Sequence, residues 1–338
     1  MRRLLRLLPV VALVTVAATA CGTSGSGGAG GAGTGGGDQM SLKLADDFPP
    51  TDPLNTFLNN FAVDVTKRTS GNVKVTLFKG GQLGSEGDIV RGVANGTIAM
   101  SMVGVTGYPP LDAFFTPYAV RSQHQLDLII EQKMLQKYID QFETNQHAHL
   151  LGTLYVSPRQ MTSKKPINSV QDVQGLKLRV PKINSEVKVF TAMGAQPTIL
   201  AFTEVYTALQ NGAADAQENP VSTILSAKFY EVQPYLDLTN HGIQPQWVFV
   251  NSDVWAKLSQ SQKDAVTEAF TAMAKDQRKA AEGSFKKDVE TLQSKGMKVV
   301  NPPYDDFRAK VYDSTVRPLL AELWGADLVD KIQNLPAS

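Results

Sequence analysis

A potential carboxylate-binding arginine stands at the end of a predicted strand. The segment Gly-Leu-Lys-Leu-Arg-Val-Pro (175–181) alternates apolar residues with Lys177 and Arg179, as a half-buried strand does. A guanidinium presents a planar fork of donors that matches a carboxylate. The alternation puts Arg179 on the polar face, so an arginine in water is the ordinary interpretation.

Further candidates lie at other predicted strand-to-helix turns. In open α/β sheets, ligands bind beyond the carboxyl ends of the strands, where helix N-termini also offer free N–H groups. The turns are predicted at 46–53, 79–86, 102–107, 179–185, 201–204 and 217–220. Besides Arg179 they contain Asp47, Glu86, Phe202 and Asn219. Asn219 precedes a proline and also suits a plain turn, and Phe202 also suits a core.

Motifs for catalysis are weak. His147 and His149 have only Glu143 near them at helical spacing, which favours an exposed helix end over a metal site. The segment 79–84 (Lys-Gly-Gly-Gln-Leu-Gly) lacks the Gly-Lys-Ser/Thr ending of a phosphate loop. A nucleophile elbow is absent as well, apart from serines in the glycine-rich stretch near the N-terminus. We therefore expect no enzymatic activity, no cofactor and no metal.

The composition is that of an ordinary globular protein. The chain has 338 residues, 42% hydrophobic and 19% charged, which is enough for two lobes. Lys and Arg total 33 against 32 acidic residues, and Arg2, Arg3 and Arg6 fall in a leader, which leaves 30 basic residues in the remainder. No basic patch is evident, which argues against nucleic acid as a partner.

The N-terminus has the pattern of an export signal, predicted at 1–20. Three arginines precede an apolar run and four small residues. Cys21, the only cysteine, follows as in a bacterial lipobox, although Ala18 stands where leucine is usual. We expect acylation of Cys21, and the alternative is an ordinary cut after Ala20.

The glycine-rich segment 21–38 would be a flexible tether. The protein would then be lipid-anchored at the outer face of the bacterial cytoplasmic membrane, or periplasmic.

Strands and helices alternate from residue 41 onward. A β-α-β-α-β order is predicted within 42–102 and again within 176–217, which calls for parallel sheets in two α/β lobes. Between them, 121–143 is predicted as helical. A long helix at 259–295 would break at most once, near Gly283, and Pro302-Pro303 would end the regular structure. A strand at 245–255 would cross back between the lobes, predicted as 39–156 plus 245–284 and 157–244 plus 285–338.

Four segments in this order closely resemble the solute-binding proteins of TRAP transporters, of the dicarboxylate-receptor type. They are residues 78–86, 159–181, 193–220 and 228–241, and the block from 159 to 241 is the most specific. The resemblance covers nearly all of 40–325. It implies a periplasmic-binding-protein-like (Venus flytrap) fold with a long lobe-spanning helix. It also implies closure over a small organic acid anion, which is handed to integral membrane subunits for uptake driven by an ion gradient.

The resemblance also implies roles for individual residues. Arg179 would pair with the ligand carboxylate, Arg159 would be a second arginine, and Asn219 and Phe202 match further family positions. Asp47 and Glu86 fall at turns that provide contacts in some members. The like charges of the two arginines would then need screening by Glu86, Asp47 or water in the empty cleft.

Two departures from the family pattern narrow the ligand. The segment 102–108 is neutral where sialic acid binders carry a glutamate, which argues against sialic acid. Gln-Glu-Asn-Pro (217–220) replaces the Glu-Trp pair of members that use a metal ion, which argues against a metal. The remaining alternatives are a binding protein of an ATP-driven importer or a sensor, and a secreted α/β enzyme that uses His147 or His241. A structural hydrogen bond is the favoured role for His241.

Overall fold

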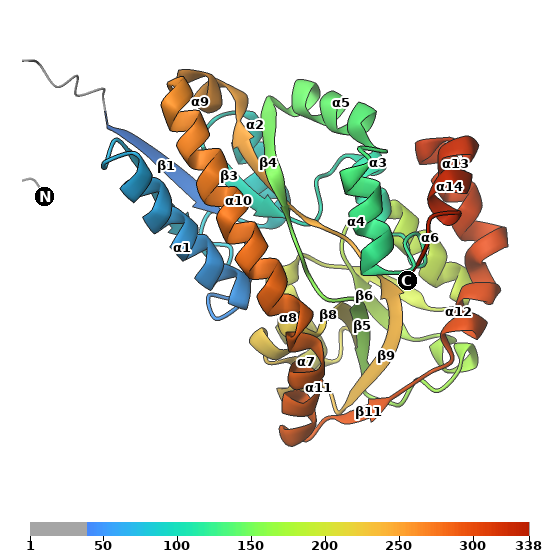
Figure 1. Ribbon diagram of the computed structural model, residues 1–338. Coiled ribbons are helices and arrows are strands. Elements are labelled where there is room, and N and C mark those ends of the chain that lie inside the picture. Colours follow the sequence, from blue (N-terminus) through green and yellow to red (C-terminus); the bar gives the residue numbers. More distant parts are fainter. Residues whose placement is uncertain (1–38, 338) are drawn as a thin grey trace, which may run out of the picture. The chain divides into compact units, whose positions relative to one another are not determined.

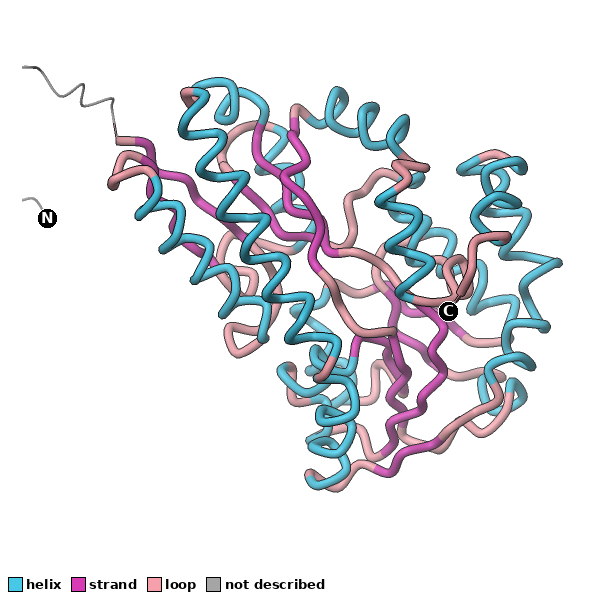
Figure 2. The backbone as a smooth tube through the Cα atoms, viewed as in Figure 1, coloured by secondary structure: helices cyan, strands magenta, loops and turns pink. Residues whose placement is uncertain are grey.

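The computed structural model describes residues 39–337. The predicted signal peptide 1–20 and the predicted tether 21–38, with Cys21, lie outside the described residues. The described chain forms two β-sheets with helices packed around them (Figures 1 and 2), which confirms the predicted α/β class.

In the first sheet one strand, β10, runs against the direction of the other four. Its strand order is β2-β1-β3-β10-β4. The strands are β1 (Met40–Ala45), β2 (Val73–Phe78), β3 (Met100–Val103), β4 (Ala148–Leu154) and β10 (Gln246–Asn251). β1 is parallel to β2 and β3, whereas β10 runs antiparallel to β3 and β4. β10 comes after the strands of the second sheet and thus returns the chain to the first sheet. This agrees with the prediction that a strand near 245–255 crosses back.

The second sheet has the order β11-β9-β5-β8-β6-β7. The strands are β5 (Arg159–Ser163), β6 (Lys177–Val180), β7 (Gln196–Ile199), β8 (Ala216–Pro220), β9 (Tyr235–Gly242) and β11 (Lys298–Val300). β6 is parallel to β7 and β8, and β5 is antiparallel to β8 and β9. This order places β5 and β6 on either side of β8, so side chains far apart in the sequence meet there.

Helices connect and cover the strands. They are α1 (Pro53–Arg68), α2 (Glu86–Ala94), α3 (Pro109–Asp112), α4 (Gln123–Glu131), α5 (Gln136–Gln146), α6 (Asn184–Met193), α7 (Val205–Asn211), α8 (Val221–Ser226), α9 (Ser252–Lys257), α10 (Gln260–Glu282), α11 (Ser284–Ser294), α12 (Tyr304–Val311), α13 (Arg317–Trp324) and α14 (Ala326–Gln333). In α1 the apolar stripe that includes Leu58, Phe61 and Val65 is buried. Asp52 caps this helix through its Oδ1, 3.0 Å from the backbone nitrogen of Leu54.

The predicted long helix with one break is confirmed as α10 and α11, separated at Gly283. α10 packs against α1 and β4 of the first sheet, and α11 packs against α8 beside the second (Figure 1). The Gln277 amide ties α10 to the segment between the sheets, since it accepts from the Tyr155 nitrogen at 3.0 Å and donates to the Tyr155 oxygen at 2.9 Å. A helix therefore spans both sheets, as expected.

Two predicted boundaries are wrong. The helical stretch 121–143 is two helices, because Lys133 takes a left-handed backbone conformation (φ 52°) between α4 and α5. Regular structure does not end at Pro302-Pro303, since Pro303 directly precedes α12 and two more helices follow. Proline lacks an amide donor and has a fixed φ, so it starts a helix as readily as it stops one.

The C-terminal helices are fixed to earlier parts of the chain. The Trp324 indole donates to the Pro110 carbonyl at 2.7 Å, and the Gln125 amide donates to the Ile332 carbonyl at 2.8 Å. Within residues 39–337, no helix combines the length and apolar character needed to cross a bilayer.

Candidate functional site

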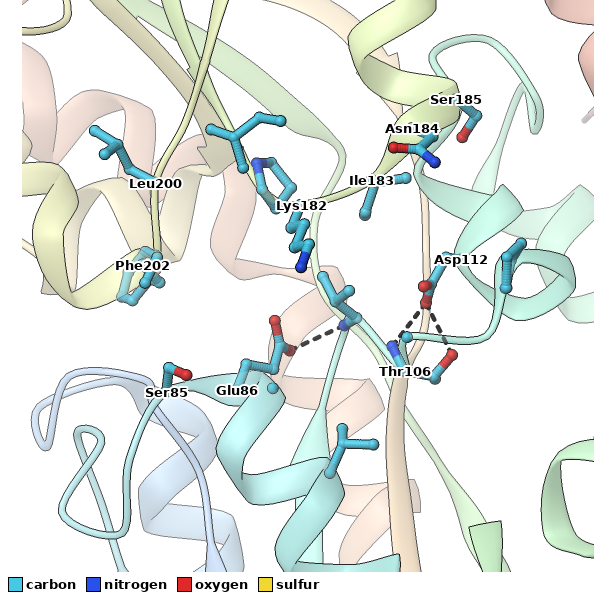
Figure 3. Close-up of a pocket in the computed structure, with 18 of the residues that line it drawn as sticks. Ser85, Glu86, Thr106, Asp112, Lys182, Ile183, Asn184, Ser185, Leu200 and Phe202 are labelled. Carbon is cyan, nitrogen blue, oxygen red and sulfur yellow. Dashed lines mark hydrogen bonds between the residues drawn. The ribbon is translucent and has the colours of Figure 1, made fainter. Parts of the chain in front are cut away.

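A cleft of about 840 Å³ lies between turns that belong to the two sheets, and a small inner pocket of about 40 Å³ shares part of its wall. Together they give the size range of a small-molecule site. Figure 3 shows Glu86 on one side of the cleft and Lys182 and Phe202 on the other. The inner pocket is lined by all six residues that the sequence singled out: Asp47, Glu86, Arg159, Arg179, Phe202 and Asn219.

Arg159 is already neutralised by a carboxylate. Its Nε and Nη2 donate to the two oxygens of Glu218, and Nη2 also lies 3.3 Å from Asn219 Oδ1. Its guanidinium stacks over the Phe115 ring at 5.1 Å. The sequence predicted Glu86, Asp47 or water as the screen for the charges of the two arginines. The direct partner of Arg159 is instead Glu218, whereas the charge of Asp47 acts on Arg179. Glu218 provides the screen because β5 and β8 are direct neighbours.

Glu218 stays ionised in spite of its burial. Burial alone would raise its pKa, but the charge of Arg159 and a hydrogen bond from His241 lower the pKa to about 2. His241 Nε2 lies 3.3 Å from Glu218, and Nδ1 lies 2.7 Å from the Thr239 hydroxyl. Burial lowers the pKa of the His241 imidazole. His241 therefore positions the ion pair, in agreement with the structural role expected for it.

Arg179 is buried rather than solvated, so the ordinary interpretation of its strand pattern is wrong. Only 3% of the residue is exposed. Its Nε and Nη2 both donate to the Leu200 carbonyl, at 3.0 and 2.7 Å. Within residues 39–337, Arg179 has no carboxylate close enough for an ion pair, and burial lowers the pKa of its guanidinium. Most of its five donors remain for a ligand in the inner pocket.

Glu86 and Asp47 bring carboxyl groups to the opposite wall. Glu86 Oε1 accepts from the nitrogens of Gly104 and Val105, at 2.5 and 2.9 Å, and its other oxygen points into the cleft (Figure 3). Burial, and next the charge of Asp47, raise the pKa of Glu86 to about 8. Burial raises the pKa of Asp47 to about 6, although the charge of Arg179 opposes this shift.

Asn219 lies inside a strand, so the predicted turn at 217–220 is wrong. β8 runs from Ala216 to Pro220 and pairs with β5 and β6. The polar run is tolerated there because its side chains find buried partners: Asn219 donates to Gln217 Oε1 at 2.6 Å, and Gln217 donates to the Thr162 hydroxyl at 2.9 Å.

Phe202 combines the two positions that the sequence left open, the wall of the cleft and an apolar cluster. It lines the cleft, and its ring centroid lies 6.1 Å from Phe48 and 6.2 Å from Phe229. The ring thus joins an aromatic cluster while it presents an apolar wall to the cleft.

His147 and His149 do not lie together at the end of a helix. His147 follows α5 in a left-handed conformation, whereas His149 lies in β4, stacked on Trp255 at 4.5 Å. Among residues 39–337, no group of three or more His, Cys, Asp or Glu residues is placed to hold a metal ion.

Sequence reasoning missed two residues of the inner pocket that lie outside the predicted turns, and one buried acid beside it. Gln246 and Phe115 line the pocket, and Glu186 is buried next to Glu218 and both arginines. Burial and the charge of Glu218 raise the pKa of Glu186 well above its ordinary value. Glu186 has a weak signal, because it is an acid in the first turn of α6, directly after a predicted strand-to-helix turn. Gln246 and Phe115 have none, since both stand in segments that suit a core.

Comparison with known proteins agrees with this arrangement. The family model described as bacterial extracellular solute-binding protein, family 7, matches residues 44–323. The sialic acid-binding periplasmic protein of Vibrio cholerae is 31% identical over 266 residues, which cover 75% of this chain and 83% of that protein.

Solved structures show the same likeness. A TRAP periplasmic solute-binding protein from Roseobacter denitrificans, with bound L-galactonate, has a TM-score of 0.78 and 32% identity, covering 85% of this chain and 99% of that one. Another from a Polaromonas species, bound to D-erythronate, has a TM-score of 0.82 and 28% identity, covering 88% and 100%.

Proposed function

Since the chain belongs to the bacterial extracellular solute-binding proteins of family 7, which serve TRAP transporters, we propose that its cleft captures a small organic acid anion through Arg179. The captured anion is then delivered to the integral membrane subunits of a TRAP transporter for uptake driven by an ion gradient.

One observation carries this proposal. Arg179 is a buried cation in the wall of the inner pocket, and among the described residues no carboxylate forms an ion pair with it. A buried charge with no carboxylate in direct contact is costly, and an anion in the pocket relieves that cost. A ligand carboxylate fits the fork of Arg179 and forms charge-assisted hydrogen bonds there.

The remaining predicted residues take supporting roles. Arg159, whose charge Glu218 balances, lines the same pocket, and Asn219 lies beside it. Phe202 provides an apolar wall. Asp47 and Glu86 contact the ligand from the other side.

Ligand binding is coupled to closure. The pocket wall combines residues of the first sheet's turns with residues of the second sheet, so the anion touches both sides at once only when the cleft is shut. Binding would then shift the population toward the closed form. In this proposal the moving lobes are residues 39–156 plus 245–284 and 157–244 plus 285–338.

The location follows from the family, whose members act outside the cytoplasm. We further propose that Cys21 is acylated and that 21–38 tethers the folded part to the outer face of the membrane. An ordinary signal cut would leave the protein periplasmic instead.

A direct binding experiment tests the proposal. The purified protein is stripped of any retained ligand and titrated calorimetrically with organic acids, among them L-galactonate and D-erythronate, with galactitol and erythritol as uncharged controls. We expect saturable binding of at least one acid and none of the uncharged polyols. Binding that is equally strong for an acid and its uncharged counterpart would contradict the assignment of Arg179. Turnover of a bound acid into a new product would favour the alternative of a secreted enzyme.

A further inference from the structure

Four buried charged residues meet beside the inner pocket. Arg159, Arg179, Glu186 and Glu218 come from β5, β6, α6 and β8, and each is at most 4% exposed. The charges of both arginines and of Glu218 act on Glu186. Because Arg159 and Glu218 form an ion pair with each other, the state of Glu186 decides whether the cluster carries a net charge.

Glu186 has the surroundings of a neutral carboxyl group. Its Oε2 is buried without a hydrogen-bond partner among residues 39–337, and no basic side chain of that part of the chain forms an ion pair with it. The first turn of a helix favours an acid through the helix dipole, yet no N–H at the start of α6 donates to this oxygen. An ionised carboxylate without such partners is much more costly to bury than the neutral acid.

The neighbouring carboxyl group of Glu218 is the acceptor for a proton on Glu186. The two groups are placed to share a hydrogen bond, which needs a proton because carboxylate oxygens only accept. Glu218 does not carry that proton, since both of its oxygens accept from Arg159 and its pKa is about 2. Burial lowers the pKa of His241, so this imidazole adds no charge at neutral pH.

The other elements packed against α6 supply no counterion for Glu186. These elements are β7, α12, the turn Ala113–Phe115 and the π-helical segment Tyr312–Val316. β7 and the turn contain no titratable side chain. Burial raises the pKa of Tyr304 and Tyr312, which are therefore neutral, and Arg308 stacks on the Tyr312 ring at 3.7 Å. The remaining charged residues of these elements and the lysine of α6 are exposed, and they are Asp305, Asp306, Lys310, Asp313 and Lys188.

A proton on Glu186 leaves the charge of Arg179 available to a ligand. Two arginines against one carboxylate give the cluster a single positive charge when Glu186 is neutral, and no charge when Glu186 is ionised. An anion at Arg179 then neutralises the cluster in the first case and adds an uncompensated negative charge in the second. Anion binding therefore favours the protonated form of Glu186.

We infer that Glu186 is a positioning residue for the charge of Arg179, and that capture of an anion there is linked to a proton on Glu186. Glu186 lines neither the cleft nor the inner pocket, so it acts through the arginines without touching the anion. This inference rests on the proposed function, since Arg179 must hold the anion. Affinity is complete where Glu186 is protonated in the free protein, and it falls as the pH rises above the pKa of that state.

Calorimetry in buffers of different ionisation enthalpy measures the linked proton in the unaltered protein. L-galactonate and D-erythronate are the probes, because their carboxylates are ionised throughout a range from about pH 6 to about pH 10. We expect proton uptake on binding toward the upper end of this range, together with a declining affinity. Asp47 and Glu86 contribute to the decline, since burial also raises the pKa of these pocket residues.

Glu186→Gln separates the contribution of Glu186 from theirs. Glutamine keeps the shape of the acid and a donor for Glu218, but it has no proton to lose. The variant should bind as tightly as the wild type at about pH 6 and at least about tenfold more tightly at about pH 10, with less proton uptake. A purely structural role for Glu186 would instead weaken binding at every pH.

Glu131→Gln is the matched control. It makes the same chemical change on the exposed end of α4 and should follow the wild type at every pH. A thermal melt of each variant checks the fold.

Infrared difference spectroscopy reads the proton without any added acid. The ligand-free protein at neutral pH should show a carbonyl band of a protonated carboxyl group that Glu186→Gln removes and Glu131→Gln keeps. Other buried acids give bands of their own, so the loss specific to Glu186→Gln is the result that counts.

The outcomes separate the inference from the proposed function. Parallel pH profiles with equal proton uptake in the wild type and in Glu186→Gln would overturn the linkage and leave the acid receptor intact. Absence of a band that belongs to Glu186 would do the same, because the residue would then be ionised. If Glu186→Gln does not fold, absence of proton uptake by the wild type over the whole range rejects the linkage without a variant. Failure of both acids to bind at any pH would count against the proposed function and the linkage together.

Discussion

Arg159 and Glu218 form a buried ion pair across the neighbouring strands β5 and β8, with 5% and 0% of their side chains exposed. Glu218 therefore balances the charge of Arg159 inside the protein. Arg179, which has no ion-pair partner among the described residues, is therefore the arginine that depends most on a ligand. Two arginines in one pocket thus have different roles: one organises the wall, and the other holds the anion.

Replacing Arg179 by lysine should weaken ligand binding. A lysine keeps the charge but loses the planar fork, so we expect a loss of about 1–3 kcal/mol in binding free energy. Isothermal titration calorimetry with the tightest-binding acid measures it. Arg68→Lys, on the exposed face of α1, is the matched control and should bind normally. Unchanged affinity in Arg179→Lys would rule out bidentate pairing.

Breaking the buried pair should destabilise the fold. Glu218→Gln leaves the charge of Arg159 buried and unpaired, and the expected cost is about 3–5 kcal/mol in the free energy of unfolding. Removing both charges, as in Arg159→Met with Glu218→Leu, should cost clearly less. Urea unfolding of Arg159→Met, Glu218→Leu and the variant that combines them gives the coupling between the two residues. Additive losses would show that the pair contributes no coupling to stability.

Stability of the ligand-free protein should fall as the pH rises above 5. Glu86 has a folded pKa of about 8 against an ordinary 4.5, and Asp112 has about 6 against 3.8, in both cases mainly through burial. The folded state therefore binds protons more tightly than the unfolded state. This contribution is complete below the ordinary pKa and is lost as the pH rises through the folded value.

Thermal melts between pH 5 and 9 check this dependence. Glu86→Gln should flatten the part of the decline above pH 7, and Glu131→Gln should not. Glu218 acts in the opposite direction, since its pKa of about 2 lies below the ordinary 4.5 and its contribution is lost toward pH 2. A melting temperature that is independent of pH from 5 to 9 would contradict the burial of these acids.

Lys182 should speed the capture of anions. It is an exposed cation of the cleft wall outside the inner pocket, so it attracts an anion before the final contacts form. Lys182→Gln should lower the association rate several-fold at low salt and weaken its salt dependence, with a smaller change in the dissociation rate. Stopped-flow fluorescence measures both rates. Lys74→Gln on β2 is the control, because it removes the same charge away from the cleft. An equal decrease of the association rate in this variant would show that the net charge of the protein, and not the position of Lys182, sets the rate.

Replacing Cys21 by alanine should release the protein from membranes. Without the thiol no acyl chain can be attached, and the remaining protein would lack its anchor. Fractionation of cells that express each form, with detection in membrane and soluble fractions, gives the answer. Retention of the Cys21→Ala protein in the membrane fraction would exclude the lipid anchor.

The sequence by itself determined the alternating strands and helices of 42–102 and 176–217 and the long helix after 259. Leu58, Phe61 and Val65 mark α1 because helical periodicity is a local property, and Gly283 marks the break in the long helix for the same reason. Local rules also placed Arg179 at the end of a strand in front of a helix, where ligands bind in α/β proteins.

Only the tertiary structure decided which side chains meet. The segment Gln-Glu-Asn-Pro (217–220) has the composition of a turn, because polar residues before a proline favour turns. In the structure these residues belong to β8, a strand in the interior of the second sheet. Their burial is tolerable because Arg159, 59 residues earlier, lies on the adjacent strand and pairs with Glu218. The same pairing of distant strands buries Arg179 and leaves it without a carboxylate partner among the described residues. Long-range contacts of this kind depend on strand order, which no local pattern in the chain specifies.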